Sequence, residues 1–92
     1  MREKTPKPIR NIDELKKWCA DHDGVCQCFV LLNGGFRSSK DIHHYPGDGS
    51  WDVFHYISDS WVESKDDETF RKEESFLLEA MTANAFFAYP DP

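Results

Sequence analysis

The chain has 92 residues, of which 39% are hydrophobic and 30% are charged, and its net charge at pH 7 is −6. This length provides one hydrophobic core and leaves no room for a second one. An acidic chain does not present the basic face that nucleic-acid binders carry, and its apolar runs are far shorter than the roughly 20 residues of a membrane span. We therefore expect one small domain that neither binds nucleic acid directly nor enters a membrane.

Residues 1–10 combine Lys, Arg, Glu and Thr with Pro6 and Pro8. Such residues contribute little to packing, and each proline biases the residue before it away from helix. We expect a flexible N-terminal arm over 1–10 and a single domain over 11–92. The arm has no apolar stretch of the secretory type, and the three cysteines are an odd number that suits free thiols, so we expect a cytoplasmic protein.

The first helix is predicted to begin at Asn11, a residue type that caps helix N-termini well. Apolar residues then recur at spacings of three and four, from Ile12 to Cys19, and form one stripe. Gly24 is the expected C-terminal stop of this helix.

Residues 25–64 predict a meander of three or four antiparallel strands. Residues 25–32 are apolar on both faces, residues 36–45 are more polar, and residues 51–57 alternate, with Asp52, Phe54 and Tyr56 on one face. Two turn signals separate these runs, Asn33-Gly34-Gly35 and residues 46–50. A fourth short strand is expected at residues 61–64.

From Asp66 onward the pattern predicts a helical segment with a break near residues 73–75, followed by an apolar end that packs as a last turn or a short strand. The predicted fold is α+β: an N-terminal helix, a three- to four-stranded antiparallel β-meander, and a C-terminal helical segment packed on one sheet face. The predicted core consists of Ile12, Leu15, Trp18, Val25, Phe29, Leu31, Ile42, Val53, Ile57, Leu77 and Met81.

A cluster of cysteines and a histidine suggests a small zinc- or redox-responsive domain as one function. Cys19, His22, Cys26 and Cys28 are all of ligand type, although their spacing matches no known zinc module. Cys26 and Cys28 share a strand face, where buried cysteines serve as small apolar residues. Packing is therefore the favoured role, and we predict no metal and no other cofactor.

An enzyme is not expected. Cys19 and His22 lie near the end of the predicted helix, where the helix dipole raises the pKa of a thiol and so disfavours a nucleophile. Neither a nucleophile-elbow motif nor a phosphate-binding loop is present in the sequence. A chain of this size also has little volume for a deep pocket beside its core.

The acidic run between residues 59 and 79 is the feature that we weigh most for function. Its carboxylates can form a surface for a basic partner, with Trp51, Tyr56, Trp61 and Phe70 nearby as aromatic anchors. A simpler interpretation is that the charge only keeps the protein soluble. The predicted partner-binding residues are Asp59, Trp61, Glu63, Asp66, Asp67, Glu68, Glu73 and Glu74.

The leading hypothesis is a small acidic, non-enzymatic binding protein that inhibits or modulates a nucleic-acid-handling protein by occupying its basic surface. Carboxylates can compete with nucleic acid for such a surface, because both present negative charge. Small stand-alone acidic proteins also occur among phage and mobile-element inhibitors, and the comparison is an analogy of size and charge only. We expect a monomer or a weak homodimer.

Overall fold

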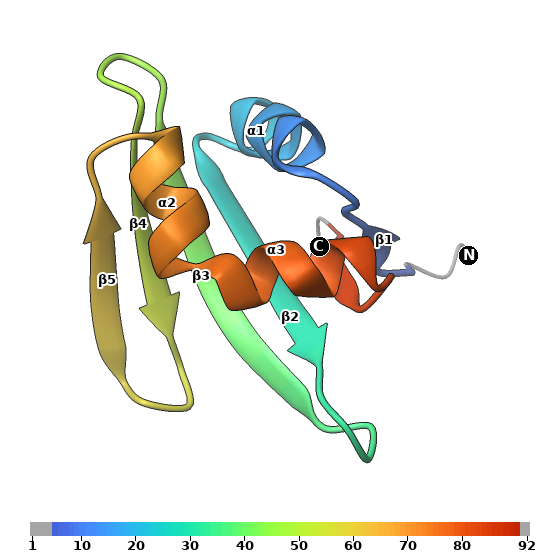
Figure 1. Ribbon diagram of the computed structural model, residues 1–92. Helices are drawn as coiled ribbons and strands as arrows, with labels where there is room; N and C mark the ends of the chain where they lie inside the picture. Colours follow the sequence, from blue (N-terminus) through green and yellow to red (C-terminus); the bar gives the residue numbers. More distant parts are fainter. Residues whose placement is uncertain (1–4, 91–92) are drawn as a thin grey trace.

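The computed structural model describes residues 5–90 and has an α+β fold with one antiparallel sheet and three helices (Figure 1). The six strands lie in the order β1-β6-β2-β3-β4-β5. The elements along the chain are β1 (Lys7–Pro8), α1 (Ile12–Asp21), β2 (Val25–Leu31), β3 (Arg37–Tyr45), β4 (Ser50–His55), β5 (Ser60–Ser64), α2 (Asp67–Glu73), α3 (Ser75–Thr82) and β6 (Phe86–Ala88).

The meander predicted from the turn signals is present as β2, β3, β4 and β5, which pair consecutively. Gly34 and Gly35 adopt φ values of 86° and 83° in the first turn, a region that glycine enters without steric cost. The fourth strand expected near residues 61–64 is β5. In the register of β3 with β4, His43 pairs with Asp52 and Lys40 pairs with His55.

The sheet is wider than predicted, because two short strands extend it beyond β2. The apolar end of the chain forms β6, which pairs with β2, and β1 pairs with β6. Lys7 and Pro8, which we expected in a flexible arm, therefore belong to the sheet. Ile9 is buried, and its amide donates to the carbonyl of Phe86 at 3.0 Å. Pro8 is compatible with this position because β1 is an edge strand. Residues 1–4 lie outside the described residues.

Side-chain caps explain where two of the helices begin. The Asn11 side chain accepts a hydrogen bond from the Glu14 amide at 2.9 Å, which caps α1 as predicted. Asp66 accepts one from the Thr69 amide at 2.8 Å and caps α2 in the same way. The expected break falls at Glu74, which separates α2 from α3.

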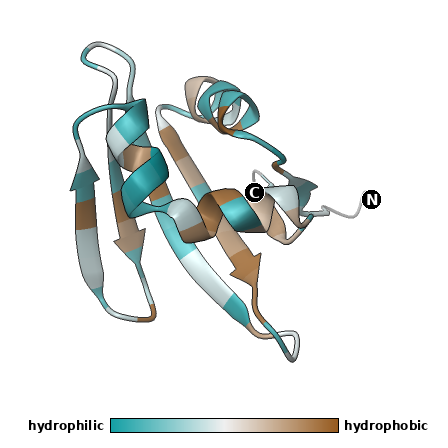
Figure 2. Cartoon of the chain, viewed as in Figure 1, coloured by the Kyte–Doolittle hydropathy of each residue, from teal (hydrophilic) through white to brown (hydrophobic). Residues whose placement is uncertain are grey.

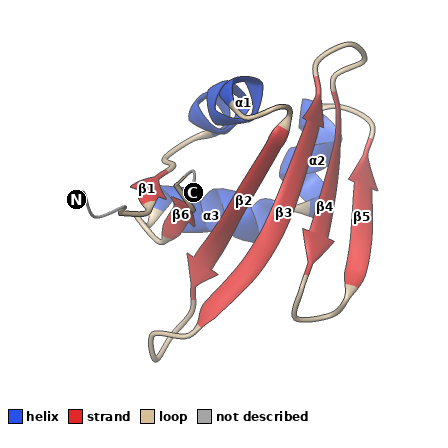
Figure 3. Cartoon of the chain, turned by 180° about the vertical axis from the view of Figure 1, so that it is seen from behind, coloured by secondary structure: helices blue, strands red, loops and turns tan. Residues whose placement is uncertain are grey.

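All three helices lie on the same face of the sheet (Figure 1). Brown, hydrophobic positions on β2 and β4 lie beneath the helices in Figure 2. Within residues 5–90 no helix covers the opposite face, which is seen from the front in Figure 3. We call it the open face; it presents the side chains that alternate with the buried ones along β2 to β5.

The core lies between the helices and the covered face. Six of the predicted core residues are buried there: Ile12, Leu15, Ile42, Val53, Leu77 and Met81. A seventh, Phe29, is also buried, but it lies on the opposite face of β2, where its ring packs against Phe87 and Tyr89. Four are not, because Trp18 and Val25 are half-buried and Leu31 and Ile57 are exposed. Leu31 is on the open face of β2, and Ile57 follows β4 in a turn that lies beyond the helices.

Candidate functional site

The predicted acidic residues do not form one surface. Trp61 and Glu63 lie on β5, whereas the remaining members apart from Asp59 belong to α2 or flank it. The prediction that Glu74 contacts a partner is wrong. Its side chain is buried and accepts a hydrogen bond from His55 Nε2 at 3.0 Å. It fixes the junction of α2 and α3 to β4 and cannot present charge to a partner.

Two carboxylates at the start of α2 are already bound within the protein. Asp66 is the N-cap, and the hydrogen bond that it accepts from the Thr69 amide lowers the pKa of its carboxyl. Asp67 forms an ion pair with Lys16 and accepts a hydrogen bond from Trp51 Nε1 at 2.8 Å. Burial raises the pKa of Asp67, but the hydrogen bonds from Lys16 and Trp51 outweigh burial and the net shift is downward. Reversing these charges would perturb the fold as well as any interface.

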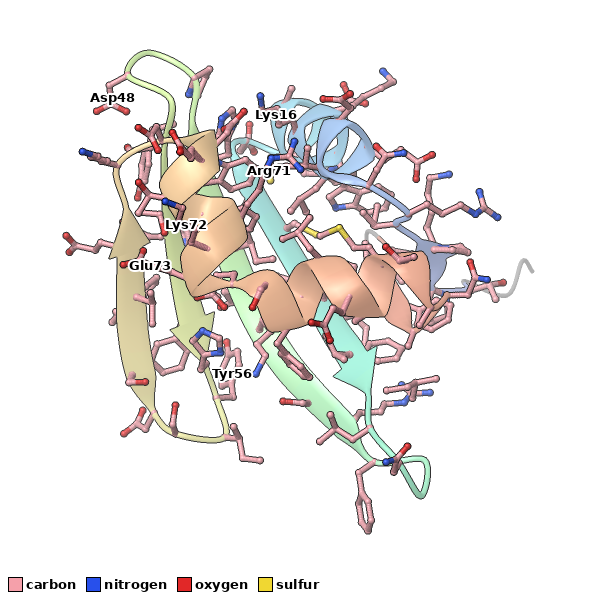
Figure 4. The ribbon with its side chains drawn as sticks, viewed as in Figure 1. Lys16, Asp48, Tyr56, Arg71, Lys72 and Glu73 are labelled. Carbon is pink, nitrogen blue, oxygen red and sulfur yellow. The ribbon has the colours of Figure 1, made fainter. Side chains whose placement is uncertain are left out.

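The rest of α2 carries its own counter-charges. Lys72 Nζ lies 3.8 Å from Glu68 Oε2, one helical turn away. Glu73 accepts a hydrogen bond from Ser64 Oγ at 2.6 Å, which ties α2 to β5. Arg71, Lys72 and Glu73 follow one another on this helix (Figure 4). Because Arg71 and Lys72 lie among its carboxylates, α2 is a weaker anionic surface than the sequence suggested.

The open face gathers aromatic side chains from β3, β4 and β5. The Trp61 ring lies 5.1 Å from the ring of Phe54 and 5.4 Å from that of His43, measured between centroids. Tyr56 meets Phe54 edge-on at 4.8 Å. Trp61 and Tyr56 remain 55% and 52% exposed as residues, so both are accessible to a partner. Aromatic side chains of this kind are enriched at interface hot spots.

Carboxylates stand among these aromatic rings. Asp41 accepts a hydrogen bond from Tyr56 Oη at 2.7 Å, and Asp52 accepts one from Tyr45 Oη at 3.0 Å. These hydrogen bonds raise the pKa of both tyrosines. Glu63 is exposed and forms no hydrogen bond or ion pair with the rest of residues 5–90. The open face of β3–β5 therefore offers negative charge beside apolar area.

The site set predicted from sequence omitted Asp41 and Asp52. The signal for Asp52 was present, because the alternation in β4 had already placed it on one face with Phe54 and Tyr56. Trp51 and Phe70 were predicted to be aromatic anchors for a partner, and this is wrong. Both are fully buried, and their rings stack with centroids 4.2 Å apart. Which face of β4 the helices would cover was not readable from alternation alone.

Asp59 lies apart from both acidic groups, in the turn between β4 and β5. Its φ is 55°, in the left-handed region that Asp tolerates better than most residues. Its side chain is exposed at the end of the meander. The turn geometry accounts for this residue, and its charge adds to the acidic character of the β5 end.

The cysteines form part of the core. Cys19, Cys26 and Cys28 are all free and buried between α1 and the sheet. Burial and the neighbouring Cys26 raise the pKa of Cys19 to about 12, so its thiol stays protonated. His22 stacks on Trp18 with centroids 4.1 Å apart. Across the described chain, no three His, Cys, Asp or Glu side chains are grouped so that they could hold a metal ion.

A second polar cluster lies beneath the α2–α3 junction. Lys40 is buried, and its Nζ donates to Ser38 Oγ at 2.9 Å. It pairs across the ladder with His55, which bonds to Glu74. Burial lowers the pKa of Lys40, and attraction to Glu74 opposes that shift. These groups satisfy one another inside the fold and are closed to a ligand.

A cavity of about 490 Å³ opens between the end of α1 and the turn after β3. Lys16 at its rim is paired with Asp67, and His44 packs on the Trp51 ring with centroids 4.2 Å apart. Burial and the charge of Lys16 lower the pKa of His44. The polar groups here hold α1 and α2 to the sheet, so the open face is the stronger candidate for recognition.

Comparison with known proteins adds no assignment. No family model matches the chain, and no curated protein and no solved structure is significantly similar to it. Among the described residues, no helix has the length and apolar character needed to cross a membrane.

Proposed function

We propose that this protein is a small, non-enzymatic binding protein that occupies a basic surface of a nucleic-acid-handling protein and so inhibits or modulates it. The observation that carries the proposal is the pairing of carboxylates with half-exposed aromatic rings on the open face, at Asp41, Asp52 and Glu63 beside Trp61 and Tyr56. This surface replaces the α2 surface that the sequence favoured.

The composition of the open face suits a cationic partner better than a neutral one. Carboxylates attract Lys and Arg side chains and raise the rate of encounter. The exposed faces of Trp61 and Tyr56 can receive the same side chains through cation–π contacts. Arg37 already lies 4.4 Å from the centroid of the Phe29 ring on this face, which illustrates the geometry. A groove that binds nucleic acid presents the matching array of basic groups.

The overall charge of −6 reinforces this choice, because a strongly acidic molecule is repelled by nucleic acid and drawn to proteins that bind it. We place the protein in the cytoplasm, where its three thiols stay reduced, and we expect a monomer or weak homodimer before it meets its partner. No observation favours the zinc- or redox-responsive alternative over this one.

Affinity capture from source cells tests the proposal, at about 50 and about 300 mM salt because screening weakens contacts between charges. Three baits are compared: the wild type, an open-face variant with Trp61→Ala and Glu63→Lys, and a control variant with Glu68→Lys. The control makes the same charge change as Glu63→Lys, but on α2. We expect wild type and control to capture a basic nucleic-acid-handling protein at low salt, and the open-face variant to lose it.

Two outcomes would overturn the proposal. Capture that survives the open-face substitutions would show that another surface binds the partner. A wild-type bait that captures nothing at either salt concentration would leave the charge with a solubility role. Circular dichroism of each bait shows whether it is folded, so that loss of binding is not confused with loss of structure.

A further inference from the structure

β5 is one of the two outer strands of the sheet, and nothing in the described chain pairs with its second side (Figure 3). Outer strands carry unpaired backbone groups that can bind another strand, and many proteins block them with Pro, Lys or a bulge. The sequence of β5, Ser-Trp-Val-Glu-Ser, contains neither Pro nor Lys, and its register with β4 is continuous without a bulge. This edge is therefore competent for strand addition.

The hydrogen bonds at the ends of the ladders establish which backbone groups face outward. The Tyr56 amide donates to the Ser39 carbonyl at 3.3 Å, so even-numbered residues of β4 bond toward β3. On the other side of β3, the His44 amide donates to the Gly24 carbonyl at 2.9 Å, so even-numbered residues of β3 bond toward β2. The two observations agree, because bonding alternates along an antiparallel strand.

The same alternation continues into β5. Odd-numbered residues of β4 bond toward β5, and among them Val53 pairs with Val62. Trp61 and Glu63 flank Val62 and must point their N–H and C=O groups away from the sheet. Neither residue uses its backbone in any other hydrogen bond within residues 5–90. Their side chains lie on the open face, so outward backbone groups and the proposed binding side chains belong to the same two residues.

We propose that β5 binds an extended, basic segment of its partner as an added strand, through the backbone groups of Trp61 and Glu63. This inference rests on the proposed function and specifies how the partner is held. Main-chain hydrogen bonds supply affinity in this mode, and alternate side chains supply specificity. A Lys or Arg of the added strand lies opposite Glu63, and the side chain two residues away lies opposite Trp61.

Charge selects a basic segment over a second copy of this chain. Glu63 lies on the open face of the edge, and Glu73 lies on the covered side, where it bonds to Ser64 of β5. Asp59 adds a third carboxylate at the preceding turn. A second copy would place its own carboxylates against these groups and bring together two chains of charge −6. Like charges across adjacent strands are destabilising.

The test uses an octapeptide of alternating Arg and Thr as the probe, with a Glu–Thr octapeptide as its control. Amide hydrogen exchange is followed by NMR in the whole protein. We expect saturating Arg–Thr peptide to slow exchange at Trp61 and Glu63 about tenfold, because these amides become hydrogen-bonded. The Glu–Thr peptide should leave both rates unchanged.

Two substitutions of Glu63 separate the contribution of its backbone N–H to peptide binding from that of its side-chain charge. Glu63→Pro removes an outward N–H and leaves the ladder to β4 intact, whereas Val62→Pro breaks that ladder and serves as the destabilised reference. Glu63→Gln keeps the N–H and removes only the charge. We expect Glu63→Gln to weaken binding and retain slowed exchange at Trp61, and Glu63→Pro to lose both while remaining folded.

Several outcomes would overturn strand addition. Peptide binding that shifts the resonances of Asp41, Asp52 and Trp61 without slowing the two amides would show a side-chain interface, and the proposed function would still stand. Exchange that slows with protein concentration alone would identify a second copy as the occupant. If the Arg–Thr peptide does not bind but the partner is still captured, strand addition at the β5 edge is excluded, and the proposed binding function of the open face still stands.

Discussion

Trp51 and Trp61 lie on neighbouring strands and have opposite environments. Trp51 is on the covered face, fully buried, stacked on Phe70 and bonded through Nε1 to Asp67. Trp61 is on the open face, more than half exposed, with its ring tilted against that of Phe54. The register pairs Trp61 with Phe54 and places Trp51 three residues earlier on β4, so the two rings fall on opposite sides of the sheet. Strand parity, and not residue type, separates the side chain that stabilises the fold from the one that is available for recognition.

The largest expected effect is the contrast between these tryptophans. Trp51→Ala removes a buried ring and leaves a cavity, which costs about 3–5 kcal/mol of unfolding free energy. Trp61→Ala removes a ring already in contact with water, so we expect a cost of about 1 kcal/mol or less. Urea denaturation followed by circular dichroism measures both. Equal losses from the two substitutions would contradict the division between the faces.

Glu73 and Glu74 provide a second contrast, between adjacent carboxylates. Glu74→Gln removes a buried charge that bonds to His55 and attracts Lys40, and we expect a loss of about 1–3 kcal/mol. Glu73→Gln keeps an oxygen that can accept from Ser64, so a change within about 0.5 kcal/mol is expected for this exposed side chain. Thermal denaturation of the two variants measures both stability changes. A larger loss from Glu73→Gln than from Glu74→Gln would overturn the assignment of Glu74 to the interior.

A pH dependence is expected from Asp67. Its folded-state pKa lies below the unfolded value of 3.8, so its contribution to stability is present above that value and is lost as pH falls through the folded pKa. Asp67→Asn should therefore lower the melting temperature at neutral pH, and the difference from wild type should shrink in acid. Glu68→Gln, on the same helix, is the matched control. A difference that grows in acid would reverse the assigned sign.

The smallest effect is expected at Ile57. Although alternation placed it with Val53 on one face, its side chain is 76% exposed beyond the end of β4. Ile57→Ala should change the unfolding free energy by no more than about 0.5 kcal/mol, as is usual for surface positions. Val53→Ala, in the core, is its control. A cost at Ile57 comparable to that at Val53 would show that the turn packs against something else.

Much of the fold was predictable because strong local signals mark it. Asn11 and the Asn33-Gly34-Gly35 turn specify a helix start and a hairpin through their own backbone preferences. The break at Glu74 was also expected. Strands β1 and β6 are two and three residues long, too short for a periodic pattern, and only their pairing with each other and with β2 defines them.

The site was predicted less well than the fold. Alternation assigns side chains of β4 to two sets but does not say which set the helices cover. Trp51 was therefore taken as an anchor, although α2 lies over it, while Asp41 and Asp52 were passed over. Glu74 looked like part of an acidic run because a charge pattern carries no record of burial. These are consequences of tertiary packing, which a local pattern does not contain.

The pairing of β1 with β6 also bears on how the chain can be re-engineered. Lys7 lies opposite Ala88, so the two ends of the described chain meet at the sheet edge farthest from β5. A short linker between them would allow circular permutation, with new termini opened in the Asn33–Gly35 turn, where the glycine backbone is exposed. Such a permutant would keep every strand pairing while reversing the order in which the edges are synthesised.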